Sequence, residues 1–420
     1  MPRMFPSARR TRGLASSLAL AVVLAGGGVA ATVATSSAAY AQGKPAYTPA
    51  FVKVYEPVAA IVNKGGDLAA AKAQVPAIVA AVQSADDRNA AGTLILSLGT
   101  KLNDKPLERQ GLELMVASGK VTPDKLGQIQ YFIGSLAYDA NDYPAALTAF
   151  RAAQAAGYTD ENFPGVVAEA YFKNNQFAPG LQSLKAAIDQ RIAAHTPVPE
   201  IWIKRGLQVA YDNKLTQQAN DWSALLVANY PTPENWQIAV QVVNAVNPLD
   251  PQAQLDLLRL MALSNGMKQR QDFARYIEVA DPRVMSNEVA KVLQSAVSAG
   301  ALTTSDSYYQ EIKRTVDQRT ASDRADAPKL VAAARTAANG NAALTAGDVV
   351  YSIGDYSQAE QMYQLALQKG GVDKDKALTR LGIAQAQQGK NADARATFAQ
   401  VAGARAPVAR MWQAYVTAKA

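Results

Sequence analysis

The sequence predicts an all-α fold made of stacked pairs of antiparallel helices, and three observations predict it. Many helix start signals are spread along the chain. Sustained strand alternation and Asn-Gly hairpin turns are almost absent. Finally, a set of small and apolar residues with the same internal offsets occurs twice: Gly134, Ala146, Phe150 and Ala153, then Ala168, Gly180, Leu184 and Ala187. The two sets repeat with a period of about 34 residues, and such a period, with two helical segments in each unit, is typical of stacked helix pairs.

The same offsets recur further along the chain. Glycine inside a helix costs about 0.5–1 kcal/mol relative to alanine, so a recurring glycine in the first helix needs a packing reason. We expect it to let the second helix approach closely, with a large apolar side chain of that second helix filling the space between them. The further sets are Gly206, Gln218, Trp222 and Leu225; Gly347, Ala359, Tyr363 and Ala366; and Gly382, Ala394, Phe398 and Val401. Gln218 departs from the small residue expected at the second position of the set, and the spacing between successive sets is uneven.

Helix starts are marked by a capping Thr or Asp followed by proline, as at Thr48-Pro49, Thr232-Pro233 and Asp250-Pro251. Pro76 should kink the helix in which it lies. The polar stretch 318–328 is the best candidate for a joint between helices. Outside the repeats, the pattern predicts helices near 50–63, 67–83, 87–101, 106–118, 234–246, 252–264, 267–280, 286–299, 304–319 and 326–338, with a last helix from Val408 to Lys419 that covers the end of the stack.

The repeated pattern resembles the tetratricopeptide repeat (TPR) family. The resemblance is closest over 126–190 and 341–403, moderate over 199–264 and weak elsewhere. It implies a right-handed α-solenoid without a sheet, whose concave face is lined by the first helix of each pair. It also implies that the chain binds a protein or a peptide.

The N-terminus resembles a secretory signal peptide. Four arginines precede an apolar stretch from Leu14 to Leu24, and Ala39-Tyr40-Ala41 forms an A-x-A cleavage site. An uncleaved membrane anchor is the alternative, and no other stretch is long enough to span a bilayer. The predicted organisation is a signal peptide over 1–41, a flexible lead over 42–48, helical hairpins over 49–125, TPR-like repeats over 126–264, degenerate helical repeats over 265–338, and TPR-like repeats with a capping helix over 339–420.

The amino-acid composition excludes or disfavours several classes of function. Without the signal peptide, 38 Lys and Arg face 35 Asp and Glu, a net charge of about +3, which is weak evidence for nucleic-acid binding. The absence of cysteine excludes disulfides, thiolate catalysis and a lipid-anchoring lipobox. His195 is the single histidine, so neither a metal site, a cofactor site nor a catalytic residue is predicted. Two sets of motifs have structural interpretations: carboxylate pairs at predicted helix starts (Asp86-Asp87, Asp323 with Asp326, Asp373 with Asp375), and helix stops at Lys64-Gly65-Gly66 and Lys369-Gly370-Gly371.

The remaining candidate site is the groove lined by first helices. Tyrosine and phenylalanine are frequent anchors at interfaces, although filling gaps between neighbouring repeats is the more common role of such side chains. We expect a non-enzymatic periplasmic scaffold that binds a protein or peptide partner of the cell envelope. The alternatives are a structural or glycan-binding envelope component and, with less support, a cell-wall-acting enzyme with a buried glutamate in a cleft. The predicted groove residues are Tyr131, Ser135, Tyr138, Glu169, Phe172, Lys173, Tyr211 and Tyr351.

Overall fold

The computed structural model describes residues 45–419, which form helices and connecting turns without any strand. The predicted signal peptide over 1–41 and residues 42–44 lie outside this range. The chain divides into two compact units between Ala187 and Ile188, a division that falls inside the predicted repeat block 126–264. Within residues 45–419, no helix is both long enough and apolar enough to cross a membrane.

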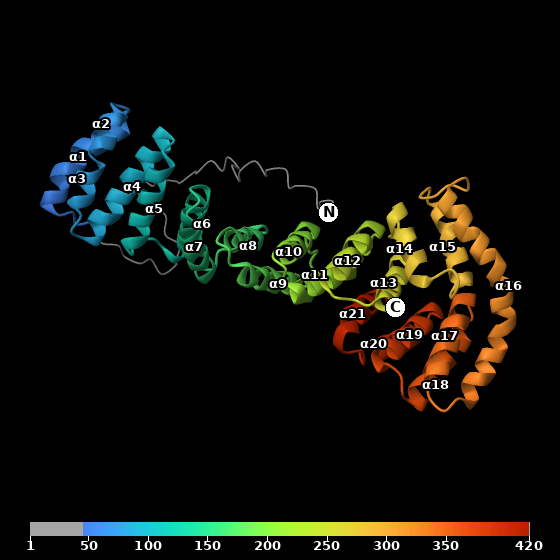
Figure 1. The fold of residues 1–420 in the computed structure, drawn as a ribbon. Helices are drawn as coiled ribbons and strands as arrows, with labels where there is room; N and C mark the ends of the chain where they lie inside the picture. Colours follow the sequence, from blue (N-terminus) through green and yellow to red (C-terminus); the bar gives the residue numbers. More distant parts are fainter. Residues whose placement is uncertain (1–44, 420) are drawn as a thin grey trace. The chain divides into compact units, whose positions relative to one another are not determined.

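In the first unit, helices pack mainly on their neighbours along the chain (Figure 1). The helix predicted over 67–83 is interrupted at Gln74, just before Pro76, so the expected distortion is present as a break between two short helices. The helices are α1 (Pro49–Lys64), α2 (Leu68–Ala73), α3 (Val75–Ala80), α4 (Ala85–Leu102), α5 (Lys105–Ala117), α6 (Pro123–Asp139), α7 (Tyr143–Ala155), α8 (Phe163–Lys173) and the first part of α9 (Phe177–Ala193).

The described part of the predicted lead, residues 45–48, is held against the start of α4. The Ala46 N–H donates to Asp86 at 3.0 Å, and the N–H and hydroxyl of Thr48 donate to the two oxygens of Asp87 at 3.0 and 2.8 Å. Asp87 also accepts the N–H of Ser84. Burial opposes ionisation of Asp87, but these hydrogen bonds outweigh it and keep the carboxyl pKa below its ordinary value. The pair Asp86-Asp87 therefore has a structural role.

In the second unit, the last helix contacts helices from the beginning of the same unit. Helix α21 packs on α20 and also on α11, α12 and α13, and Figure 1 shows it beside them. The predicted capping helix therefore covers the last repeat and joins it to helices from the beginning of the same unit. Its helices are the rest of α9, α10 (Glu200–Asp212), α11 (Thr216–Asn229), α12 (Pro233–Val246), α13 (Pro251–Leu263), α14 (Arg270–Ala280), α15 (Ser286–Ser298), α16 (Ser307–Thr336), α17 (Asn341–Ile353), α18 (Tyr356–Lys369), α19 (Lys374–Gln387), α20 (Asn391–Phe398), the short 3₁₀ helix η1 (Gly403–Arg405) and α21 (Ala406–Ala418).

The prediction of two helices over 304–319 and 326–338 with a joint at 318–328 is wrong. Helix α16 is continuous for 30 residues. The polar stretch docks on the start of α15, where Ser286 donates to Asp323 at 2.6 Å and Arg324 donates to Asn287 at 2.6 Å. Asp323 and Asp326 consequently lie inside a helix and not at its start. A surface helix with few buried residues has too weak an apolar period to reveal its continuity.

The packing reason for the repeated glycines is confirmed. A β-carbon added at Gly206 of α10 would lie 2.3 Å from the ring of Trp222 in the paired helix α11. The other glycines at the first template position meet the aromatic side chain at the equivalent position of their own paired helix, at 2.5–2.6 Å: Gly134 with Phe150, Gly347 with Tyr363, and Gly382 with Phe398. In the remaining repeat, where alanine takes the place of glycine, Ala168 and Leu184 are both buried. The repeated offset thus marks the contact between the two helices of a pair.

Candidate binding surfaces

In the first unit, Tyr131, Ser135 and Tyr138 occupy one face of α6, because their spacing matches successive turns of the helix. All three are half-buried. The Tyr131 ring stacks on Tyr158 with centroids 4.6 Å apart and contacts Phe163 edge-on at 5.8 Å. Tyr131 therefore contributes to the junction between α6 and the chain leading to α8, as the gap-filling interpretation expects, while part of its surface stays accessible.

The remaining predicted residues of the first unit differ in exposure. Glu169 is half-buried and Lys173 is exposed. Phe172 is only 5% exposed, and a β-carbon added at Gly180 of α9 would lie 2.6 Å from its ring. The assignment of Phe172 to the groove is therefore corrected: its side chain packs between α8 and α9. The sequence did not show this because Phe172 is not part of the repeated template, which relates Gly180 only to Ala168, Leu184 and Ala187.

In the second unit, Tyr211 is half-buried, but Tyr351 is only 5% exposed. The Tyr351 ring lies 4.3 Å from the guanidinium carbon of Arg259, and its hydroxyl accepts a hydrogen bond from Gln387 at 3.1 Å. Burial raises the pKa of Tyr351 above its ordinary value. Tyr351 was predicted to face a groove, and this is corrected: the helices of the closed second unit bury it.

Beneath Tyr351, three charged side chains are buried together. Arg259 donates to both oxygens of Glu288 at 2.8 Å and to Asp256 at 3.0 Å. Tyr276 donates to Glu288 at 2.7 Å. Burial opposes ionisation of Glu288, yet the charge and hydrogen bonds of Arg259 outweigh it and hold the carboxyl pKa below its ordinary value. The bidentate geometry and the further donor are what a buried ion pair needs to be tolerated.

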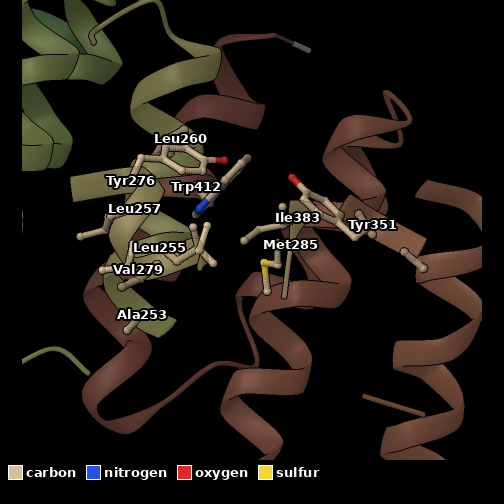
Figure 2. Packing of buried hydrophobic residues seen from close by; sticks show 14 of the residues in the cluster. Ala253, Leu255, Leu257, Leu260, Tyr276, Val279, Met285, Tyr351, Ile383 and Trp412 are labelled. Atoms are coloured by element: carbon tan, nitrogen blue, oxygen red, sulfur yellow. The ribbon is translucent and has the colours of Figure 1, made fainter. Parts of the chain in front are cut away.

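The buried cluster also ties the end of the chain to α13. Arg405 donates to Asp256 at 2.7 Å, and the indole N–H of Trp412 donates to the Asp256 carbonyl at 2.9 Å. Arg380 of α19 pairs with Asp348 of α17. Figure 2 shows apolar side chains from the same elements converging, with Trp412 near Leu255 and Tyr276 and with Tyr351 near Ile383. The space between Tyr351 and Trp412 is thus filled by side chains of the second unit itself.

Sequence analysis did not identify these buried charges. A signal was present, however, because Asp256 and Arg259 are the only charged residues of α13 and carry opposite charges about one turn apart. Such a pair normally lies on a solvent-exposed face. Their partners Glu288 and Arg405 come from distant segments, and no local pattern connects them.

His195 lies in a turn, and Asp373 and Asp375 accept backbone N–H groups. His195 lies exposed in the turn after α9, with φ of +53°. Asp373 accepts the Lys376 N–H at the start of α19, and Asp375 accepts the Ala402 N–H. Between residues 45 and 419, no group of three or more His, Cys, Asp and Glu side chains is arranged to hold a metal ion.

Comparisons with known proteins add little to this picture. No protein-family model and no curated protein matches the sequence. Among solved structures, the chain is similar to one described as "Structure of Naa15/Naa10 bound to HypK-THB", with a TM-score of 0.40 and 11% sequence identity. The alignment covers 85% of this chain and 58% of that one, so the chain spans less than two thirds of the matched protein. The packing of its own helix pairs is what identifies the fold of this chain as a stack of helical repeats.

Proposed function

We propose that the protein is a non-enzymatic scaffold that binds a protein or peptide segment on its first unit. The binding surface consists of Tyr131, Ser135, Tyr138, Glu169 and Lys173, which we call the α6–α8 surface. The observation that carries the proposal is that these five side chains are half-buried or exposed on α6 and α8, whereas the corresponding Tyr351 of the second unit is buried.

The chemistry of the α6–α8 surface favours a polypeptide partner. Half-buried tyrosines offer rigid contact area and a hydroxyl that reaches polar groups. Glu169 and Lys173 lie one helical turn apart on α8 and offer both signs of charge, which orient a partner more than they strengthen its binding. A rigid helical stack presents such side chains without the entropic cost of ordering a loop.

The site of action that we propose is the periplasm of a Gram-negative-type cell. The support is the order of features in the segment 1–41: a basic start, an apolar stretch and an A-x-A site. A chain without cysteine is compatible with this oxidising compartment, because no thiol can be oxidised there.

The two alternative functions have less support. Glycan binding by stacking needs exposed aromatic faces, and all four tryptophans, Trp202, Trp222, Trp236 and Trp412, are buried. A cell-wall-acting enzyme needs a buried glutamate that can exchange a proton with its substrate. Glu288 is buried, but Arg259 binds both of its oxygens, and Glu288 lines neither the cleft between α11 and α21 nor the cavity between α12, α13 and α14.

The test is capture of partners from envelope extracts with the chain from residue 42 onward, followed by affinity measurement with the purified partner. We expect Tyr138→Ala combined with Lys173→Glu to weaken binding by at least about ten-fold, because anchor residues contribute more than about 1.4 kcal/mol each. The matched control combines Thr148→Ala with Lys53→Glu, two exposed positions on α7 and α1.

Equal binding by the wild type, the control and the α6–α8 variant would remove the surface assignment. Turnover of cell-wall material by the purified chain, without any captured partner, would contradict the scaffold proposal itself.

A further inference from the structure

The second unit contains a cleft of about 640 Å³ where the end of the chain meets α11. One wall is formed by the start of α11 and by the turn between α12 and α13. The other wall is formed by the end of α20, by η1 and by α21. Protein interiors are close-packed, and ligand sites occupy about 300–1,000 Å³, so a space of this size is unlike an ordinary packing defect.

Ion pairs hold the two walls of this cleft together. Arg410 of α21 pairs with Asp221 of α11. On η1, Arg405 pairs with Asp250 at 3.3 Å, at the start of α13, and with the buried Asp256 at 2.7 Å. The cleft is therefore bounded by segments that are joined by the same contacts that close the second unit, and its shape is maintained before any ligand binds.

A reciprocal pair of carboxamides lies in the wall of the cleft. Asn220 donates to Asn247 Oδ1 at 3.1 Å, and Asn247 donates to Asn220 Oδ1 at 2.8 Å. The second N–H of Asn247 goes to the Val243 carbonyl at 2.7 Å. Asn220 is only 5% exposed, and this pairing leaves its second N–H and one lone pair on each carbonyl oxygen for a ligand.

The rest of the lining is nearly uncharged. Gln217, Gln413 and Thr216 supply further neutral donors and acceptors, and Pro248 and Pro407 supply apolar surface without competing N–H groups. The single ionic side chain of the lining, Arg410, is neutralised by Asp221. Carboxamides match the donor and acceptor of a peptide group. Such a lining disfavours a strongly charged ligand, because it offers no opposite charge to compensate for the ligand's loss of hydration.

We propose that this cleft binds an extended, uncharged segment of a partner polypeptide. An oligosaccharide fits less well, because sugar rings stack on exposed aromatic faces. The one aromatic side chain of the lining, Phe398, is 1% exposed and packs on Gly382. The cleft is a second site that shares no residue with the α6–α8 surface, and it does not depend on the function proposed for that surface.

The experiment measures binding of hexapeptides, labelled at the N-terminus with an uncharged fluorophore and amidated at the C-terminus, to the chain from residue 42 onward. Three peptide pools are used: uncharged (Ala, Ser, Gln, Val), acidic and basic; a labelled hexamer of N-acetylglucosamine is the fourth probe. We expect fluorescence anisotropy to show the tightest binding for the uncharged pool. Asn220→Leu should weaken that binding by about ten-fold, because it leaves peptide groups unpaired.

Ala399→Trp is the second variant, because Ala399 is exposed at the cleft and its replacement fills the space without removing a hydrogen bond. It should abolish binding while circular dichroism and the unfolding midpoint stay unchanged, which separates loss of the site from misfolding. Gln241→Leu is the matched control, because Gln241 lines a separate cavity of about 100 Å³ between α12, α13 and α14.

Several outcomes would overturn the proposal: tighter binding of the acidic pool, the basic pool or the oligosaccharide; no saturable binding of any pool; or unchanged binding by Ala399→Trp. The double variant Tyr138→Ala with Lys173→Glu should leave hexapeptide binding unchanged. If it abolishes binding, the peptides occupy the α6–α8 surface and the cleft assignment fails while the proposed function stands.

Discussion

Both units are built from antiparallel helix pairs, but their buried apolar residues are arranged differently. In the first unit, buried apolar residues form separate clusters, one around α1 to α5, one around α6 to α8 and a small one between them. In the second, one cluster extends from Val227 to Val416. The difference arises from the last helix, which packs against α11, α12 and α13 as well as against its neighbour α20.

This difference has energetic consequences. In a stack where each helix contacts only its neighbours, stability is approximately a sum of local terms, and separate parts can open independently. In the second unit, Asp256 contacts Arg405 and Trp412, and Arg259 contacts Glu288, so these contacts connect segments that lie far apart in the sequence and opening one exposes many others. We therefore expect the second unit to unfold more cooperatively, and the following variants test that expectation.

The largest effect is expected for Arg259→Met. It leaves Glu288 buried with the Tyr276 hydroxyl as its remaining donor, and breaking a buried pair in this way costs about 3–5 kcal/mol. Urea unfolding combined with hydrogen exchange should show the loss across the whole second unit. Arg275→Met, at a side chain 42% exposed, should change stability by less than about 0.5 kcal/mol. A loss confined to α13 and α15 would show that the closed unit is not cooperative.

Gly134→Ala and Gly347→Ala should each destabilise by about 1–2 kcal/mol, because overpacking costs more than the gain in helix propensity. The added β-carbon would lie 2.5–2.6 Å from the ring of Phe150 or Tyr363. Thermal unfolding and hydrogen exchange should place the Gly134 effect in α6 and α7 and spread the Gly347 effect across the second unit.

Adding Phe150→Leu to Gly134→Ala should recover part of the loss, because the chain itself pairs Ala168 with Leu184 at the same offset. If the double variant is less stable than both single variants, steric conflict at this contact is not the cause.

Acid should destabilise the second unit through Glu288. Its pKa is lower in the folded state than in the unfolded chain, so its contribution is complete above about pH 4.3 and is lost as pH falls through the folded pKa. Urea midpoints measured from neutral pH down to about pH 3 should therefore fall less steeply in Glu288→Gln than in the wild type. In the first unit the pKa of Asp87 is also lowered, and hydrogen exchange should show the effect of protonating this carboxyl at the start of α4 and at Thr48. Parallel pH profiles for Glu288→Gln and the wild type would contradict the assignment.

The smallest effect is expected for Thr48→Ala. It removes one hydrogen bond to Asp87 and should cost about 0.5–1.5 kcal/mol, visible as faster amide exchange in the first turn of α1. Thr148→Ala, at an exposed position of α7, is the control. If amide exchange accelerates throughout the first unit, the effect of Thr48→Ala is not local.

Short-range features of the fold could be predicted from the sequence. The glycine and its aromatic partner at a fixed offset encode the contact within a helix pair, and proline after Thr or Asp marked the starts of α1, α12 and α13. Both signals are local, because helix starts and helix pairs are decided within about 35 residues. The continuity of α16 was missed, because its many polar side chains hide a sparse apolar stripe.

The candidate site was predicted less well. The α6 face follows from helical spacing, but whether an aromatic residue on a first helix faces solvent depends on what packs over it. Phe172 and Tyr351 occupy positions like that of Tyr138 in the pattern, yet one packs on α9 and the other over Arg259. The cleft was invisible, since Asn220 and Gln413 come from opposite ends of the second unit and no local pattern relates them.

The sequence by itself therefore determined that the chain is helical, that its helices pair and where many of them begin, because capping, glycine packing and apolar spacing act between near neighbours. Only the tertiary structure decided that the last helix returns to α11–α13, that Asp256, Arg259 and Glu288 are buried together, and which aromatic side chains stay accessible. The physical reason is that these outcomes depend on the accumulated geometry of many successive helix pairs, which no short stretch of sequence specifies.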